Sequence, residues 1–236
     1  MPVDHSNVSS LSHYAKLLIS QRSSSRVSER SAPYGGWLKR VIDISLAVCG
    51  LLLISPLFFL AAIAVKLADG GPVFFSHQRV GFNGKSFGCL KFRTMRTDAK
   101  ERLQDYLDSD PLIREEWAAT QKLKNDPRLT PIGHVLRKSS IDELPQLINI
   151  IRGDMSLVGP RPIVTEELKK YGSLASLYLS ARPGLTGLWQ VSGRSDTTYD
   201  QRVRLDANYL SQWSFANDTG IILKTVPALF AQRGSY

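Results

Sequence analysis

An uncharged apolar run of 22 residues, from Ile44 to Val65, constrains the fold of this 236-residue chain more than any other feature. As one helix it would be roughly 33 Å long, which is enough to span the hydrocarbon core of a bilayer. A buried core helix is the alternative, but such helices are usually shorter and keep a polar stripe. The run therefore predicts a segment that lies in a membrane.

A proline in the middle of the run argues against a simple span. Pro56 removes a backbone donor and clashes with the preceding turn, so a helix bends there, and the Ser55 hydroxyl can satisfy a freed carbonyl. Each half is then only about 16 Å long. Basic residues, which resist translocation, stand on both sides of the run: Lys39, Arg40, Lys66 and Arg79. We predict a re-entrant membrane hairpin over residues 37–68, broken at Ser55 and Pro56, with a kinked span as the alternative.

The residues before the run have a different composition. Residues 1–36 contain many serines and few bulky apolar side chains, so they bury too little surface to order themselves and predict a disordered cytosolic tail. They also lack the apolar core of a signal peptide. The two cysteines, Cys49 and Cys89, lie far apart and form neither a disulfide framework nor a zinc-binding spacing. These features fit a body that faces the reducing cytosol.

Residues 69–236 are predicted to form one cytosolic or interfacial domain of the α+β class, mostly helical with short strands. Aromatic and β-branched residues at 73–76 and 86–95 predict a small hairpin, and spaced apolar residues at 98–124 predict amphipathic helices broken by a proline. The segment Ile221–Phe230 is too short to span a bilayer, and suits an interfacial helix or a core helix equally.

The most informative stretch covers residues 137–162. Four apolar residues recur there at helical spacing: Leu144, Leu147, Ile148 and Ile151. They predict a helix that begins near Asp142 and Glu143 and ends at Gly153, a natural C-cap. Beyond this helix, two prolines stiffen a turn that presents Arg161 at a fixed place.

The acidic pair has two interpretations. Ser140 and Glu143 fit the capping box S-x-x-E, which needs no chemistry. Six cations favour a chemical role instead: Arg137, Lys138, Arg152 and Arg161 nearby in the chain, and Lys91 and Arg93 upstream. An aspartate such as Asp142, at a helix N-terminus among cations, stays ionised at neutral pH, as a nucleophile or Mg²⁺ ligand must. Neighbouring helical side chains point about 100° apart, so the two acids should have different roles.

Several motifs together make residues 37–236 resemble the monotopic phosphoglycosyl transferases, the bacterial sugar transferase family. The matching motifs are Ser55-Pro56 in the apolar run, KFRTM at Lys91–Met95, SIDELPQLINIIRGDMSLVGPRP at Ser140–Pro162 and RPGLTGLWQVSGR at Arg182–Arg194. The overall match, down to the RGSY ending, is similar to the galactose-1-phosphate transferases of rhizobial exopolysaccharide synthesis.

The resemblance implies an enzyme on the cytoplasmic face of the bacterial inner membrane that moves a sugar-1-phosphate from a UDP-sugar to undecaprenyl phosphate. Asp142 would be the nucleophile and a Mg²⁺ ligand, and Glu143 would assist the acceptor phosphate. The basic residues would bind substrate: Arg137 through its phosphates and Arg161 through its nucleotide, with Lys91 and Arg93 as further substrate-binding residues. Galactose is the favoured sugar, with glucose as the alternative.

Two other classes of function compete with this one. Asp108-Ser109-Asp110 has the letters of the D-x-D motif of metal-dependent glycosyltransferases, but no apolar strand leads into it. The formal net charge of +9 also suits a membrane-tethered adaptor that binds nucleic acid or lipid, which would leave the acidic pair unexplained. We therefore expect inner-membrane lipid, and no nucleic acid, as a partner, and a homodimer stays open.

Overall fold

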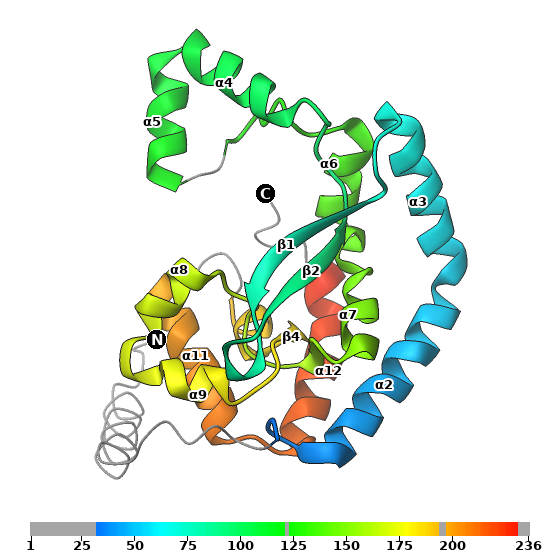
Figure 1. The fold of residues 1–236 in the computed structure, drawn as a ribbon, viewed down its shortest axis with the longest axis vertical. Helices are drawn as coiled ribbons and strands as arrows, with labels where there is room; N and C mark the ends of the chain where they lie inside the picture. Colours follow the sequence, from blue (N-terminus) through cyan, green and yellow to red (C-terminus); the bar gives the residue numbers. More distant parts are fainter. Residues whose placement is uncertain (1–31, 121–122, 194–196, 231–236) are drawn as a thin grey trace, which may run out of the picture.

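The computed structural model describes residues 32–120, 123–193 and 197–230. This part of the chain is mostly helical, with two small two-stranded sheets near its centre (Figure 1). The α+β class predicted from the sequence is therefore confirmed.

The apolar run forms two helices that meet at a sharp bend. Helix α2 (Gly36–Leu53) and helix α3 (Ser55–Asp69) are inclined by 67°, and Pro56 lies in the first turn of α3. The Ser55 hydroxyl donates to the Leu52 carbonyl over 2.8 Å, so the predicted break and its hydroxyl partner are confirmed. No single helix in the described ranges is long and apolar enough to cross a membrane, whereas this bent pair could do so by length and composition.

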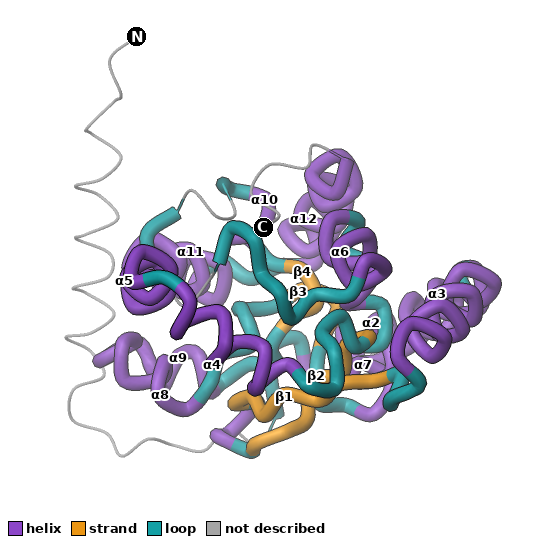
Figure 2. The backbone as a smooth tube through the Cα atoms, turned by 90° about the horizontal axis from the view of Figure 1, so that it is seen from above, coloured by secondary structure: helices purple, strands orange, loops and turns teal. Residues whose placement is uncertain are grey.

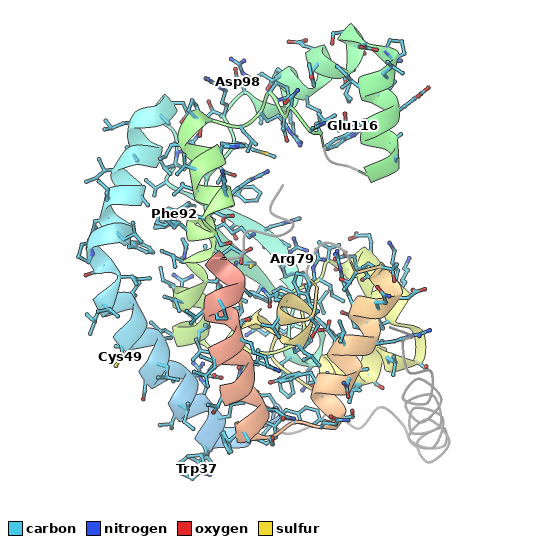
Figure 3. All side chains as sticks on the ribbon, turned by 180° about the vertical axis from the view of Figure 1, so that it is seen from behind. Trp37, Cys49, Arg79, Phe92, Asp98 and Glu116 are labelled. Carbon is cyan, nitrogen blue, oxygen red and sulfur yellow. The ribbon has the colours of Figure 1, made fainter. Side chains whose placement is uncertain are left out.

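Much of the bent pair is apolar and exposed. Six large side chains are between 64% and 83% exposed: Trp37, Leu52, Leu53, Phe59, Leu60 and Leu67. They belong to the helices that form one edge of the molecule in Figures 1 and 3. An apolar surface of this extent marks an interaction site, because soluble monomers rarely leave one uncovered.

The base of α2 is fixed to the body by buried charges. The Lys39 ammonium lies 2.6 Å from Asp218 and 3.5 Å from Asp43, and all three side chains are buried. Arg40 donates to backbone carbonyls at the C-terminal end of α7 (Gln146–Arg152). Lys39 and Arg40 therefore hold the base of α2 in place.

Two predicted elements follow the bent pair. Strands β1 (Phe74–Val80) and β2 (Ser86–Phe92) form the expected antiparallel hairpin around a 3₁₀ turn at Phe82–Gly84. Helices α4 (Ala99–Ser109) and α5 (Pro111–Thr120) confirm the amphipathic pair and its break at a proline. Figure 1 shows this pair extending away from the body.

Short elements around a two-stranded parallel sheet form the rest of the body. Strands β3 (Ser156–Val158) and β4 (Gly184–Thr186) lie at its centre, with helices around them (Figure 2). A Cβ on Gly184 would lie 2.2 Å from the Gly159 backbone nitrogen, so only glycine permits this close approach. The surrounding helices are α6 (Pro131–Lys138), α8 (Thr165–Leu168), the 3₁₀ helix Lys169–Leu174, α9 (Ala175–Leu179), α10 (Leu188–Val191), α11 (Tyr199–Ser211) and α12 (Phe215–Phe230).

Both ends of the described chain refine the predicted boundaries. Residues 1–31 of the predicted tail lie outside the described residues, but Tyr34 packs against the cluster around Val158 and donates its N–H to the Ser180 carbonyl over 3.3 Å. The ordered body thus begins before residue 37. At the other end, α12 buries Ile221 in the same cluster, as a core helix would, and leaves Leu223 exposed.

Candidate active site

The acidic pair stands on a 3₁₀ turn. Ile141–Glu143 forms this turn, and α7 begins only at Gln146. Ser140 precedes it with φ at +58° and makes no side-chain cap, so the predicted capping box is wrong and the helix starts later than predicted. A left-handed serine costs of order 1 kcal/mol and persists only where the surrounding structure holds it, as often happens at functional sites.

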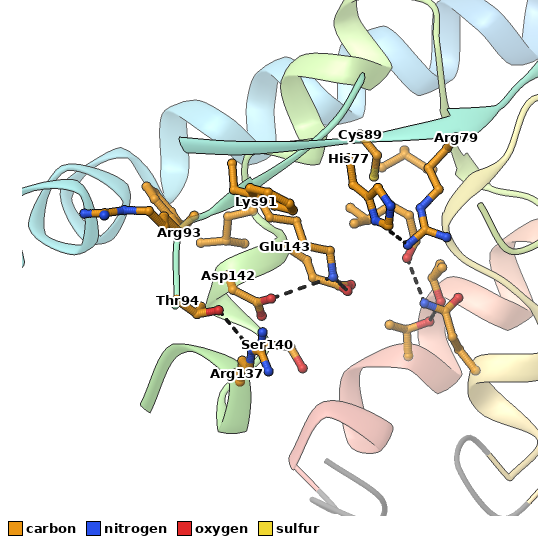
Figure 4. A pocket seen from close by; sticks show the side chains of 18 of the residues that line it. His77, Arg79, Cys89, Lys91, Arg93, Thr94, Arg137, Ser140, Asp142 and Glu143 are labelled. Carbon is orange, nitrogen blue, oxygen red and sulfur yellow. Dashed lines mark hydrogen bonds and ion pairs between the residues drawn. The ribbon is translucent and has the colours of Figure 1, made fainter. Parts of the chain in front are cut away.

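Asp142 and Glu143 share one partner. The Lys91 ammonium lies 2.6 Å from a Glu143 oxygen and 3.7 Å from an Asp142 oxygen (Figure 4). Asp142 is only 7% exposed, whereas the Glu143 side chain is 34% exposed. Their exposures differ, but their carboxylates converge on one cation, although neighbouring side chains were expected to point apart.

Burial controls the charge of Asp142. Burial raises the pKa of this carboxyl to about 6, with a further increase from Glu143, while Lys91 and Arg137 oppose the shift. Asp142 is therefore mostly ionised at neutral pH, as its predicted role requires. Burial alone would lower the pKa of Lys91, but the attraction of Glu143 and Asp142 outweighs it and raises that pKa.

The other predicted cations fall into two groups. Arg137, at the end of α6, donates to the Thr94 hydroxyl over 2.9 Å and lies beside Asp142 (Figure 4). Arg93 instead directs both terminal guanidinium nitrogens at Asp69, the last residue of α3, and is buried. Arg93 thus lines the site while it joins the hairpin to the end of the apolar helix pair.

Arg161 lies one layer behind the site. Its guanidinium carbon is 5.3 Å from the centre of the Trp189 ring, and that of Arg202 is 5.4 Å from the same ring. Trp189 lines the cavity that contains Asp142, whereas Arg161 does not. The Arg161 N–H donates to the buried carboxylate of Asp206 over 3.3 Å, which fixes the predicted turn.

One cavity of about 910 Å³ brings together Lys91, Arg93, Arg137, Asp142 and Glu143. Several further residues line it that the sequence analysis did not select: His77, Arg79, Thr94, Arg96, Trp189 and Gln190. Alternation along β1 could have revealed His77 and Arg79, because residues two apart share one face of a strand. Thr94, Trp189 and Gln190 stand inside motifs already quoted for the family resemblance.

The donors in the cavity suit a metal that arrives with a substrate. No three histidine, cysteine, aspartate or glutamate side chains in the described chain gather into a group that could hold a metal by themselves. Mg²⁺ is often bound by one or two carboxylates and completed by substrate phosphates and water. Asp142 and Glu143 fit that pattern, because they offer hard oxygens beside a cavity large enough for a phosphorylated ligand.

The Asp108-Ser109-Asp110 segment, which resembles a D-x-D motif, has a structural role and not a metal-binding one. Asp108 accepts from Arg114 over 3.1 Å, and Asp110 accepts from the Leu112 N–H over 2.8 Å, both on exposed surface at the junction of α4 and α5. Neither aspartate lines the cavity, so this motif does not form the site.

Comparison with known proteins identifies the family. The family profile described as bacterial sugar transferase matches residues 34–232. The exopolysaccharide production protein ExoY of Rhizobium meliloti (strain 1021) is 55% identical over 204 residues, which cover 86% of this chain and 90% of that protein.

Two longer relatives match over less than half of their own length. The undecaprenyl-phosphate galactose phosphotransferase of Salmonella typhimurium is 47% identical over 225 residues, 95% of this chain and 46% of that protein. The UDP-glucose:undecaprenyl-phosphate glucose-1-phosphate transferase of Escherichia coli (strain K12) is 39% identical over 207 residues, 84% and 41% respectively. Since the profile covers nearly the whole described body, this chain belongs to the bacterial sugar transferase family.

Proposed function

We propose that this protein transfers a sugar-1-phosphate from a UDP-sugar to undecaprenyl phosphate and so starts the assembly of an exopolysaccharide repeat unit. The observation that carries the proposal is Asp142, a buried and mostly ionised carboxylate between Lys91 and Arg137 in a cavity of about 910 Å³. Family membership and the names of the relatives supply the substrates.

The reaction has two displacements at one phosphorus atom. An Asp142 oxygen attacks the phosphorus that bears the sugar, the bond from that phosphorus to the bridging oxygen breaks, and UMP leaves. An oxygen of the acceptor phosphate then attacks the same phosphorus and breaks its bond to Asp142, which regenerates the carboxylate. The bond between the sugar carbon and its oxygen stays intact throughout, so the anomeric configuration is kept.

The other residues of the cavity supply charge and orientation. Lys91 and Arg137 offset the negative charge that accumulates on the phosphates in the transition state. Glu143, which is more exposed, orients the incoming acceptor phosphate. Arg161 contributes to nucleotide binding through the Trp189 ring that it supports. Mg²⁺, held by Asp142 and the diphosphate oxygens, would supply further charge neutralisation.

The membrane setting follows from the acceptor. A polyprenyl phosphate stays in the bilayer, so the site must lie at headgroup level. The bent pair α2–α3 serves as a re-entrant anchor of residues 37–68 in the inner membrane, with residues 69–236 on the cytoplasmic face. The exposed apolar side chains of both helices and their 67° bend support this arrangement.

Galactose is the favoured sugar, and glucose the alternative. A relative named for galactose is 47% identical to this chain, and relatives named for glucose are 39% and 41% identical.

The decisive experiment measures the nucleotide released by purified protein in nanodiscs with Mg²⁺, undecaprenyl phosphate and a panel of UDP-sugars. We expect UMP from one donor and none from Asp142→Asn. Asp108→Asn, a change at an exposed acid outside the cavity, should leave UMP release unchanged. Release of UDP would point to a glycosyltransferase, and the absence of any nucleotide product to a non-enzymatic adaptor.

A further inference from the structure

The cavity at Asp142 has a second, apolar side. Strands β1 and β2, the loop after β2, helix α6 and the 3₁₀ turn provide its charged residues. The opposite side is apolar and comes from α2, β3, β4 and α12, through Leu46, Leu157, Leu185, Ile222 and Val226. Such a cavity fits an amphiphile with an anionic head and an apolar chain.

This apolar side is continuous and carries few polar groups. Leu157 and Leu185 pack against the same core cluster, and α12 contacts both of their strands. The hydroxyls of Thr186 and Thr225 are 2.7 Å apart and satisfy each other, and Thr225 also donates to its own helix. The side therefore presents mostly hydrocarbon to whatever occupies the cavity.

The apolar side opens toward solvent between two helices. Leu46 is 48% exposed and Val226 is 54% exposed, although both line the cavity. Leu46 belongs to α2, whose exposed apolar side chains continue toward the bend, and the ion pair of Lys39 with Asp218 ties α2 to α12. Figure 3 shows α12 running upward from the base of α2, where this ion pair joins the two helices.

We propose that the prenyl chain of the acceptor enters between α2 and α12 and lies along this apolar side, with its phosphate at Asp142 and Glu143. This inference rests on the proposed function. The chain would pass from the bilayer around α2, over Leu46 and Val226, to the charged residues of the cavity without crossing a polar surface. The first isoprene units would then be bound by protein, and the remainder by lipid.

Two pairs of variants test this apolar side of the cavity, which we call the groove. Leu46→Asn and Val226→Asn place an amide in it, whereas Leu38→Asn and Leu223→Asn place the same amide at positions 45% and 67% exposed that do not line the cavity. The readout is kcat/KM for undecaprenyl phosphate divided by the rate of UMP formation without acceptor, in nanodiscs. We expect this ratio to fall about tenfold for the groove variants and to change less than about twofold for the controls.

Equal effects in both pairs, or no effect in either, would overturn the inference. A second measurement needs no variant: wild-type protein is photolabelled with undecaprenyl phosphate that carries a diazirine near its head. Labelled peptides should contain Leu46 or residues 222–228, and label confined to the outer faces at Leu38 and Leu223 contradicts the groove. UMP formation without acceptor tests the proposed function separately. If the wild type forms UMP but the groove variants leave the ratio unchanged, only the groove is refuted.

Discussion

The Lys91 ammonium holds two like-charged carboxylates close together, which is the central electrostatic feature of the site. Replacing it in Lys91→Met removes this attraction, and also a positive charge that would face the phosphates. We expect the rate of UMP release to fall by about 100-fold. Lys91→Arg keeps the charge and should recover part of the rate. If Lys91→Met folds, as judged by circular dichroism, and keeps full activity, the proposed role of Lys91 is wrong.

A second prediction at the residue scale concerns stability and pH. Asp206 is 1% exposed, and burial raises the pKa of its carboxyl to about 7 against the hydrogen bond from Tyr171 and the N–H of Arg161. The folded state thus binds this proton more tightly than the unfolded state does. The resulting stabilisation is present below about pH 4 and is lost as pH rises toward about 7.

Asp206→Asn stays neutral and can still accept a hydrogen bond from Tyr171. It should therefore remove the loss of stability that the wild type shows as pH rises toward about 7. Thermal unfolding midpoints of the variant and the wild type, measured from pH 5 to pH 8, should diverge in favour of the variant as pH rises. Asp98→Asn, at an exposed acid, is the control. Parallel curves for Asp206→Asn and the wild type would show that Asp206 does not titrate in this range.

At the scale of elements, a buried ion pair joins the first apolar helix to the last helix. Lys39→Met would leave Asp218 buried without its cation, which typically costs about 3–5 kcal/mol. Adding Asp218→Asn should restore part of the lost stability, since it removes one of the two buried carboxylates that face Lys39. A double-mutant cycle on unfolding midpoints measures this coupling. Additive effects would mean that the pair contributes little to fixing α2.

The bend between α2 and α3 supports a second test at this scale. Replacing Ser55 and Pro56 by leucine removes both devices that break the helix, and should produce one straight helix long enough to cross a bilayer. Leu67→Cys, in a Cys49→Ser background, then reports topology through an impermeant maleimide added to spheroplasts. We expect labelling only when the break is removed. Labelling with the break intact would favour the kinked span.

The sequence patterns predicted elements better than contacts. Alternation, amphipathic spacing and Pro56 predicted the β1–β2 hairpin, the α4–α5 pair and the break in the apolar run, because these depend on neighbours along the chain. The capping-box letters at Ser140 failed, since they do not reveal a left-handed backbone. Asp206 also escaped notice, because its burial depends on residues 35 or more positions away.

At the scale of the whole molecule, two forces could hold the protein at a membrane, and their magnitudes decide between them. A basic side chain near an anionic surface contributes about 1 kcal/mol, and salt screens that attraction. Burying one large apolar side chain contributes about 1.5–3 kcal/mol and resists salt. Leu53, Phe59 and Leu60 alone are 64% to 83% exposed, so the apolar term should dominate. We therefore expect the protein to stay bound to neutral vesicles in flotation at about 1 M salt, where the Debye length is about 3 Å. Replacing all three residues by serine should weaken binding with no change of charge. Failure of the wild type to bind neutral vesicles would mean that charge anchors the protein, as an adaptor with a basic face would require.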